Sequence, residues 1–126
     1  MKLSNLLVVS AAIAAFFGIG LVVVTGPLLA IYGMTLDKTG TVVAQLFGSL
    51  LIAFAVLNWF ARNIADPEAR RAVVLGNLAG NAVGFVVILL GQSAGIANQL
   101  GWSNVVIYAL LTLAWVYVQF LQPRNA

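Results

Sequence analysis

Four long stretches of the sequence contain no Asp, Glu, Lys or Arg, and they restrict the chain to very few architectures. Each has roughly the 17–25 residues that a helix needs to cross the hydrocarbon core of a bilayer. In lipid such a segment must be helical, because only a helix satisfies its own backbone groups within one segment. The stretches are Leu3–Val24, Thr41–Ala61, Ala72–Leu90 and Val105–Leu121. We therefore predict an all-α, integral membrane four-helix bundle with antiparallel up-and-down spans, forming one domain over residues 1–126.

The scarcity of charge supports this class. Charged residues make up 7% of the chain and apolar residues 63%, whereas an ordinary soluble domain carries roughly 25% charged residues. So few charges could not cover the surface of a protein in water. The chain also lacks cysteine and histidine, which removes disulfides, thiol chemistry and the Cys/His sites that hold zinc, iron–sulfur clusters or haem. We expect no cofactor and no metal site.

The basic residues predict the orientation, because cytoplasmic loops of membrane proteins carry an excess of Lys and Arg. If the spans alternate, Lys38 lies alone on one side and all the other basic residues lie on the opposite side. These are Lys2, Arg62, Arg70, Arg71 and Arg124. We expect both termini in the cytoplasm of a bacterium, with the chain in its inner membrane and the first stretch retained as a span. Contact with anionic lipid headgroups is expected for Arg62, Arg70 and Arg71.

A stripe of small residues marks one face of the third stretch. Ala72, Gly76, Gly80 and Gly84 repeat every four residues, so they lie one above another on a helix. Such a stripe lets a neighbouring helix approach closely and gain van der Waals contact. The first two stretches contain matching small pairs, at Ala11/Ala15, Ala14/Gly18, Ala44/Gly48 and Ser49/Ala53. We expect a helix-packing face that meets these pairs or a second copy of the chain.

Two amides occupy the same stretch. Asn77 and Asn81 lie one helical turn apart, and Gln92 lies near the same face. An unpaired amide in hydrocarbon costs several kcal/mol, so these side chains should face protein. They are therefore expected either to hold helices together or to line a small polar cavity.

The fourth stretch offers a matching face. Tyr108, Thr112 and Trp115 follow one helical stripe that continues to Gln119. We predict that this stripe meets the asparagines, with hydroxyl or indole hydrogen bonds from Thr112 and Trp115. Asn58 of the second stretch is assigned instead to the membrane interface, where it would lie beside Trp59.

The spans lack groups for acid–base or nucleophilic chemistry. No span contains an ionised side chain, although proton-coupled transporters need a carboxylate at membrane depth. Asp37, Asp66 and Glu68 are the acids of the chain, and all three stand at predicted helix starts, where capping explains them. We therefore expect a protein that is not an enzyme.

Three segments carry a resemblance. They are "LFGSLLIAFAVLNWFAR", "ARRAVVLGNLAGNAVG" and "LLGQSAGIANQLGW", which together run from Leu46 to Trp102. In these segments the chain resembles uncharacterised small four-helix inner-membrane proteins of bacteria. The resemblance implies a four-span fold and brings no assigned activity. Small fluoride channels share the four-span layout, but they carry an arginine in the first span that this chain lacks.

Three functions fit these features. The first is a non-catalytic structural or accessory subunit, which packs through its helices into a larger membrane complex or a homo-oligomer. The second is a passive channel or small-solute facilitator with an asparagine-lined path. The third is a lipid- or pigment-binding membrane module. The expected partners are the lipid bilayer and other membrane subunits or a second copy, with no nucleic acid.

Overall fold

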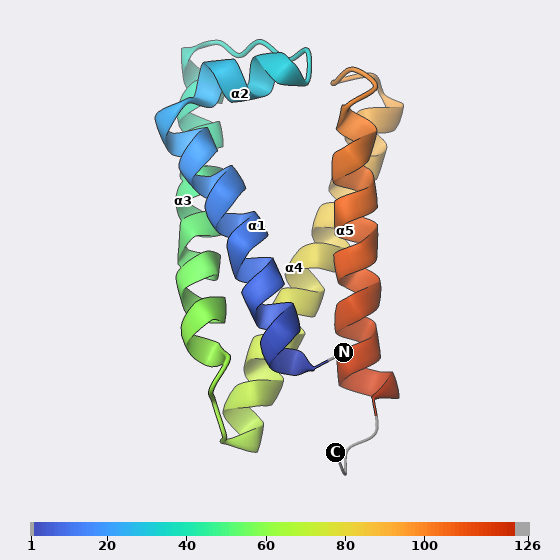
Figure 1. Ribbon diagram of the computed structural model, residues 1–126. Helices are drawn as coiled ribbons and strands as arrows, with labels where there is room; N and C mark the ends of the chain where they lie inside the picture. Colours follow the sequence, from blue (N-terminus) through green and yellow to red (C-terminus); the bar gives the residue numbers. More distant parts are fainter. Residues whose placement is uncertain (1, 123–126) are drawn as a thin grey trace.

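The computed structural model describes residues 2–122 and shows an all-α protein (Figure 1). Within those residues no β-strand occurs. The helices are α1 (Leu3–Val23), α2 (Thr25–Ile31), α3 (Lys38–Ala61), α4 (Pro67–Ser93) and α5 (Gly101–Val116), and a short π-helical turn, η1 (Tyr117–Leu121), continues α5. Four helices are long and apolar enough to cross a membrane: α1, α3, α4 and the continuous helix Gly101–Leu121. The four spans predicted from the sequence are therefore confirmed as helices. Arg124 lies outside the described residues.

Side-chain caps fix the starts of the two central helices. The Asp37 carboxylate accepts a hydrogen bond from the Gly40 amide, 2.7 Å away, at the start of α3. Asp66 accepts one from the Ala69 amide at 2.9 Å, and Pro67 takes the first position of α4. Such caps satisfy amides that the helix cannot pair itself. The capping role expected for both aspartates is confirmed.

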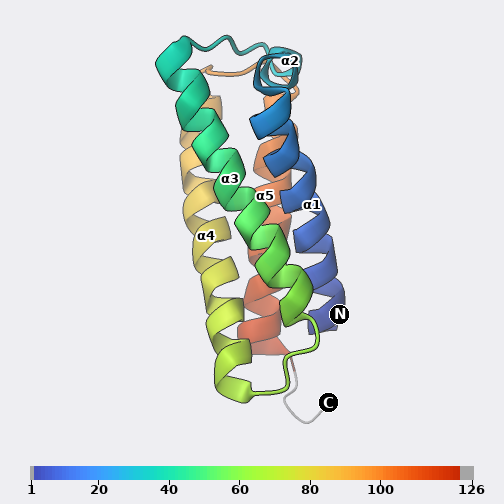
Figure 2. The ribbon, with the colours of Figure 1, turned by 90° about the vertical axis from the view of Figure 1, so that its left-hand side faces the viewer.

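The long helices pack as two pairs, α1 with α3 and α4 with α5 (Figures 1 and 2). The closest approach lies between Gly18 of α1 and Gly48 of α3. A Cβ atom on Gly18 would lie 2.9 Å from the Gly48 carbonyl oxygen, and one on Gly48 would lie 2.8 Å from that of Gly18. The two backbones are therefore in contact, which only residues without a side chain permit.

The small-residue stripe of α4 is not the single packing face that we expected. A Cβ atom on Gly76 would meet nothing within 4 Å, and one on Gly80 would meet only the Phe54 ring edge, 3.8 Å away. Ala72 is exposed. Gly84 does pack closely, against the Tyr108 ring of α5. The reason is that α3 lies close along α1 and makes few contacts with α4, so the first part of the stripe has no helix against it.

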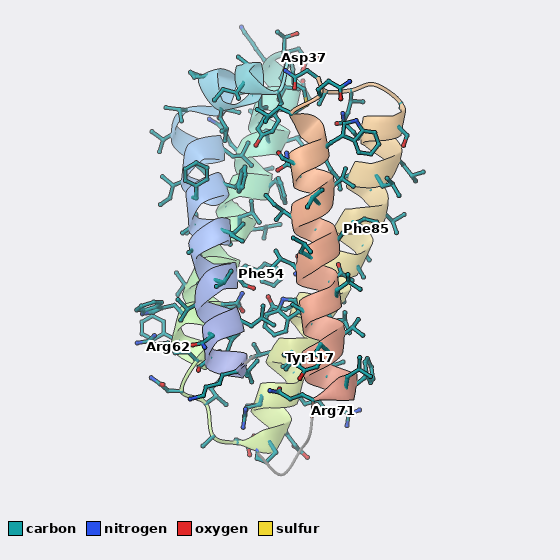
Figure 3. The ribbon with its side chains drawn as sticks, turned by 45° about the vertical axis from the view of Figure 1, so that its right-hand side comes forward. Asp37, Phe54, Arg62, Arg71, Phe85 and Tyr117 are labelled. Atoms are coloured by element: carbon teal, nitrogen blue, oxygen red, sulfur yellow. The ribbon has the colours of Figure 1, made fainter. Side chains whose placement is uncertain are left out.

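The two pairs meet at both ends of the bundle. One end, here called the basic end, carries Arg62 and Arg71 (Figure 3), together with Lys2 and Arg70, which line the same cavity. The other, the α2 end, carries α2 and the loop 94–100 (Figure 1). At the α2 end, the Asn98 amide donates to the Tyr32 carbonyl at 2.8 Å, and its side-chain Nδ2 donates to the Ile31 carbonyl at 3.0 Å. Near the basic end, a buried cluster joins all four long helices. Its members are Leu6, Leu7, Ala61, Val74 and Trp115.

Candidate binding cavity between the helix pairs

A reciprocal pair of amides links α3 to α4. Asn58 Nδ2 donates to Asn77 Oδ1 at 2.9 Å, and Asn77 Nδ2 donates to Asn58 Oδ1 at 2.8 Å. Asn77 Nδ2 also donates to the Val73 carbonyl at 2.9 Å. Both side chains are buried, with exposed fractions of 2% and 4%. The pair thus satisfies polar groups that would be costly in an apolar interior.

This arrangement corrects two predictions about the amides. Asn58, which we assigned to the membrane interface, is the partner of Asn77. Thr112 Oγ1 and Trp115 Nε1, which we expected to bond the asparagines, are buried without a hydrogen-bond partner among residues 2–122. Asn81 donates along its own helix, to the Asn77 carbonyl at 2.8 Å. The physical reason is that α4 starts well beyond the end of α3 (Figure 1), which brings the interior of α4 level with the last turns of α3.

Gln92 does not join Asn77 and Asn81, although the helical periodicity placed it near the same face of α4. Its Nε2 atom donates to the Asn98 carbonyl at 2.9 Å and, more weakly, to the Ala97 carbonyl at 3.5 Å. These bonds hold the loop 94–100 at the α2 end. Gln92 is buried there, away from the asparagine pair. Its role in the structure is to fix the loop.

Above the amide pair lies a cavity of about 340 Å³, lined by all four long helices. Ligand pockets in proteins commonly start at roughly this size. Its polar lining consists of Ser10, Asn58, Asn77, Asn81, Asn104 and Tyr108. The remaining lining is apolar apart from Gly80, and it includes Phe17, Phe47, Phe54 and Leu111. Of the residues that the sequence suggested for a polar cavity, Asn77, Asn81 and Tyr108 line this one, whereas Thr112, Trp115 and Gln92 do not.

The buried cluster closes the cavity toward the basic end. On each long helix, a member of the cluster lies one turn nearer to that end than a lining residue does. The pairs are Leu7 with Ser10, Ala61 with Asn58, Val74 with Asn77 and Trp115 with Leu111. Trp115 is fully buried. The cluster therefore forms an apolar floor beneath the polar part of the cavity.

The cavity reaches the outer surface of the bundle on the side of α3. Leu50 and Phe54 both line it, and their exposed fractions are 63% and 38%. Gly80 of α4 also lines it and is exposed. A molecule could thus enter sideways, between α3 and α4, without passing the floor.

Ser10 is the functional candidate that the sequence did not reveal. Its Oγ atom is buried, the residue is 6% exposed, and the hydroxyl has no hydrogen-bond partner in the described part of the chain. A buried hydroxyl without a partner typically costs about 1–3 kcal/mol. Ser10 lines the same cavity as Asn58 and Asn77. The position of a hydroxyl on α1 gave no signal, because serine is common in membrane helices.

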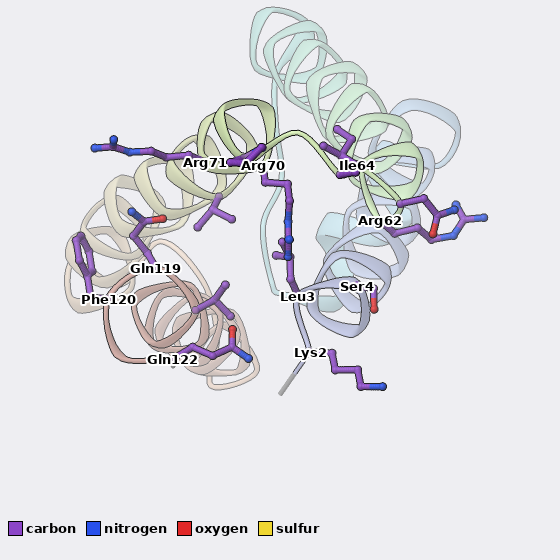
Figure 4. Close-up of a pocket in the computed structure, with 16 residues that line it drawn as sticks. Lys2, Leu3, Ser4, Arg62, Ile64, Arg70, Arg71, Gln119, Phe120 and Gln122 are labelled. Carbon is purple, nitrogen blue, oxygen red and sulfur yellow. The ribbon is translucent and has the colours of Figure 1, made fainter. Parts of the chain in front are cut away.

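A second, wider cavity of about 1010 Å³ lies at the basic end (Figure 4). Lys2, Arg62, Arg70 and Arg71 all line it. Arg62 is already engaged, because its guanidinium stacks 3.9 Å from the centre of the Trp59 ring and its Nη1 donates to the Trp59 carbonyl. The three arginines that we expect at lipid headgroups thus line one cavity, and their contact with lipid stays a prediction.

The described residues contain no group of three or more His, Cys, Asp or Glu side chains that could hold a metal ion. Comparisons with models of protein families, with curated proteins and with solved structures find no significant match to this chain. A function must therefore be inferred from the geometry of the two cavities.

Proposed function

We propose that this chain is a non-catalytic, multi-pass membrane protein that binds an uncharged amphipathic molecule of the bilayer in the central cavity of about 340 Å³. The observation that carries this proposal is the unpartnered Ser10 hydroxyl beside the Asn58–Asn77 pair. The Ser10 Oγ is enclosed, so its side chain would first rotate toward the cavity, and a ligand with a hydroxyl or carbonyl group would then supply the missing hydrogen bond. Its apolar part would lie against the phenylalanine and leucine side chains of the wall.

The lining also supports the charge and the route of the ligand. It includes no Asp, Glu, Lys or Arg, and a charged ligand would be left without a counter-ion in a medium of low dielectric. The side opening next to Leu50 and Phe54 faces the region that acyl chains would occupy. Lateral entry suits a membrane-dissolved molecule, which would not have to cross water.

The floor argues for binding over conduction. A path for a small solute through a single chain would have to pass the cluster of Leu6, Leu7 and Trp115, and these are the most deeply buried large side chains described. The asparagines therefore serve better as one polar end of a closed site than as the lining of an open pore.

We also propose an up-and-down arrangement of antiparallel spans in a bacterial inner membrane, with the basic end and both termini in the cytoplasm. The support is the gathering of Arg62, Arg70 and Arg71 around one cavity. Asp37 lies at the other end (Figure 3), and Lys38 follows it at the start of α3. An excess of basic residues on the cytoplasmic side is the usual pattern of bacterial membrane proteins.

Participation in a larger complex or homo-oligomer stays a prediction. It is supported by the outer face of α3, where Val43, Leu46 and Leu57 are exposed. Such a face must meet acyl chains or another membrane protein. Cross-linking in native membranes would identify a partner subunit or a second copy, whereas a monomer throughout would contradict the prediction.

The binding proposal is tested by native mass spectrometry of the protein extracted in mild detergent, which detects retained small molecules. Two glycines of α4 give a matched pair of variants. Gly80→Leu would place a side chain in the cavity, whereas Gly76→Leu adds the same side chain where nothing lies within 4 Å. We expect wild type and Gly76→Leu to retain the molecule and Gly80→Leu to lose it.

Ser10→Ala tests whether the Ser10 hydroxyl forms a hydrogen bond with the ligand. Removing an unpartnered buried hydroxyl should stabilise the empty protein by about 1 kcal/mol. If Ser10 holds the ligand, the same variant also retains less of it. Wild-type protein that carries no small molecule, or retention that Gly80→Leu leaves unchanged, would refute the proposal.

A further inference from the structure

The cavity at the basic end has the charge of an anion-binding site. Four basic residues line it, Lys2, Arg62, Arg70 and Arg71, and its lining includes no Asp or Glu. The two acids nearest to Arg70 in the sequence, Asp66 and Glu68, both lie outside the lining. The Asp66 carboxylate caps α4 by accepting a hydrogen bond from the Ala69 amide. The positive charge within this cavity is therefore not balanced by a carboxylate of its own lining.

The three arginines differ in what their guanidinium groups can reach. Arg62 is held against the Trp59 ring and carbonyl. In Figure 4, the Arg71 side chain extends away from the cavity, whereas that of Arg70 extends into its middle, toward Leu3 of α1. Arg70 forms no ion pair with any residue of the described chain. Among the three arginines, Arg70 is thus the one free to bind a molecule in the cavity.

The rest of the lining suits a phosphate group. A guanidinium presents two parallel N–H donors that match two phosphate oxygens. Ser4, Asn63 and Gln119 also line the cavity and add hydroxyl and amide groups to its wall. The lining also includes Val118 and Phe120, so apolar side chains lie beside the charged ones.

We propose that the cavity at the basic end binds a phosphate group, with Arg70 as its main ligand. The phosphate belongs either to the headgroup of an anionic glycerophospholipid or to a soluble phosphate. This site is separate from the central cavity, because the floor of buried side chains lies between them. Failure of one proposal therefore leaves the other standing.

The test compares Arg70→Gln with Arg71→Gln, which remove the same charge from adjacent positions. The full chain is reconstituted in vesicles of equal phosphatidylglycerol and phosphatidylcholine, then extracted in mild detergent and examined by native mass spectrometry. Wild type and Arg71→Gln should retain phosphatidylglycerol over phosphatidylcholine. Arg70→Gln should retain about fivefold less of it, the effect of one basic residue near an anionic surface.

A second arm separates the two sources of phosphate. Inorganic phosphate and glycerol 3-phosphate are titrated against the detergent-purified protein, and thermal unfolding is followed. Stabilisation of wild type that Arg70→Gln abolishes identifies a soluble phosphate as a sufficient ligand. No stabilisation, together with Arg70-dependent retention of phosphatidylglycerol, identifies the lipid.

A conservative variant guards against a folding defect. Arg70→Lys keeps the charge and loses the paired donors, so it should fold and retain an intermediate amount of phosphatidylglycerol. Equal losses in Arg70→Gln and Arg71→Gln would show a diffuse surface charge and overturn the proposal. Retention in Arg70→Gln equal to that of wild type would overturn it as well.

Discussion

The paired amides of Asn58 and Asn77 should be strongly coupled in stability. Each substitution to leucine removes both reciprocal hydrogen bonds, of 2.9 and 2.8 Å, and leaves the other amide buried without its partner. Side-chain hydrogen bonds in membrane proteins average about 0.6 kcal/mol and reach about 1.7 kcal/mol. The two bonds together are therefore worth about 1–3 kcal/mol, and the abandoned amide adds a desolvation penalty of similar size.

The expected result is a large departure from additivity. Each single variant should lose about 2–6 kcal/mol, the sum of these two contributions, and the double variant should lose little more than one single variant, because it leaves no orphaned amide. The coupling energy should thus be at least about 2 kcal/mol. The assay is reversible unfolding in mixed micelles with increasing dodecyl sulfate, followed by tryptophan fluorescence, since Trp115 lies in the buried cluster.

Asn81→Leu is the matched control. Its amide donates to a carbonyl of its own helix, at Asn77, and bridges no two helices. The variant should lose less than about 1 kcal/mol. Additive losses in Asn58→Leu and Asn77→Leu, within about 0.5 kcal/mol, would refute the reciprocal pairing.

Three further predictions concern other parts of the bundle. Gly48→Ala should destabilise the protein by about 1–3 kcal/mol, because its Cβ would lie 2.8 Å from a backbone oxygen; Gly76→Ala, with open space around it, should be neutral or stabilising in the same unfolding assay. Asn98→Ala removes the bond to the Ile31 carbonyl and should speed hydrogen exchange in α2, while unchanged exchange would show that this contact does not hold the α2 end. The chain has no cysteine, so single cysteines introduced at Asn63 or Thr39 can be labelled in intact cells with a membrane-impermeant thiol reagent. The reagent should label Thr39→Cys and not Asn63→Cys. The reverse pattern would show that the proposed orientation is inverted.

Much of the fold could be predicted from the sequence because the signals were local. A long run without charge must form a helix in lipid, and Asp66 followed by Pro67 marks a helix start wherever the helix then packs. The caps at Asp37 and Asp66 were confirmed for the same reason. These features depend on neighbours along the chain.

The partners of the amides could not be predicted, because they depend on the tilt and depth of whole helices. Helical periodicity placed Thr112 and Trp115 on a suitable face, yet the amide of Asn58 reaches Asn77 instead. The same limit applied to the glycines. The closest contact lies between Gly18 and Gly48, whereas Gly76, within the longer stripe, meets open space.

The asparagine pair also bears on how the protein is made. Asn58 belongs to the first helix pair and Asn77 to the second, and the chain leaves the ribosome in that order. When α1 and α3 have assembled, Asn58 has no amide to bond until α4 is inserted. The nascent chain that ends after the first helix pair therefore carries an amide that lipid cannot satisfy, and insertion of α4 supplies Asn77 as its hydrogen-bond partner. Truncation after the first pair should leave a segment that the insertion and quality-control machinery holds or degrades.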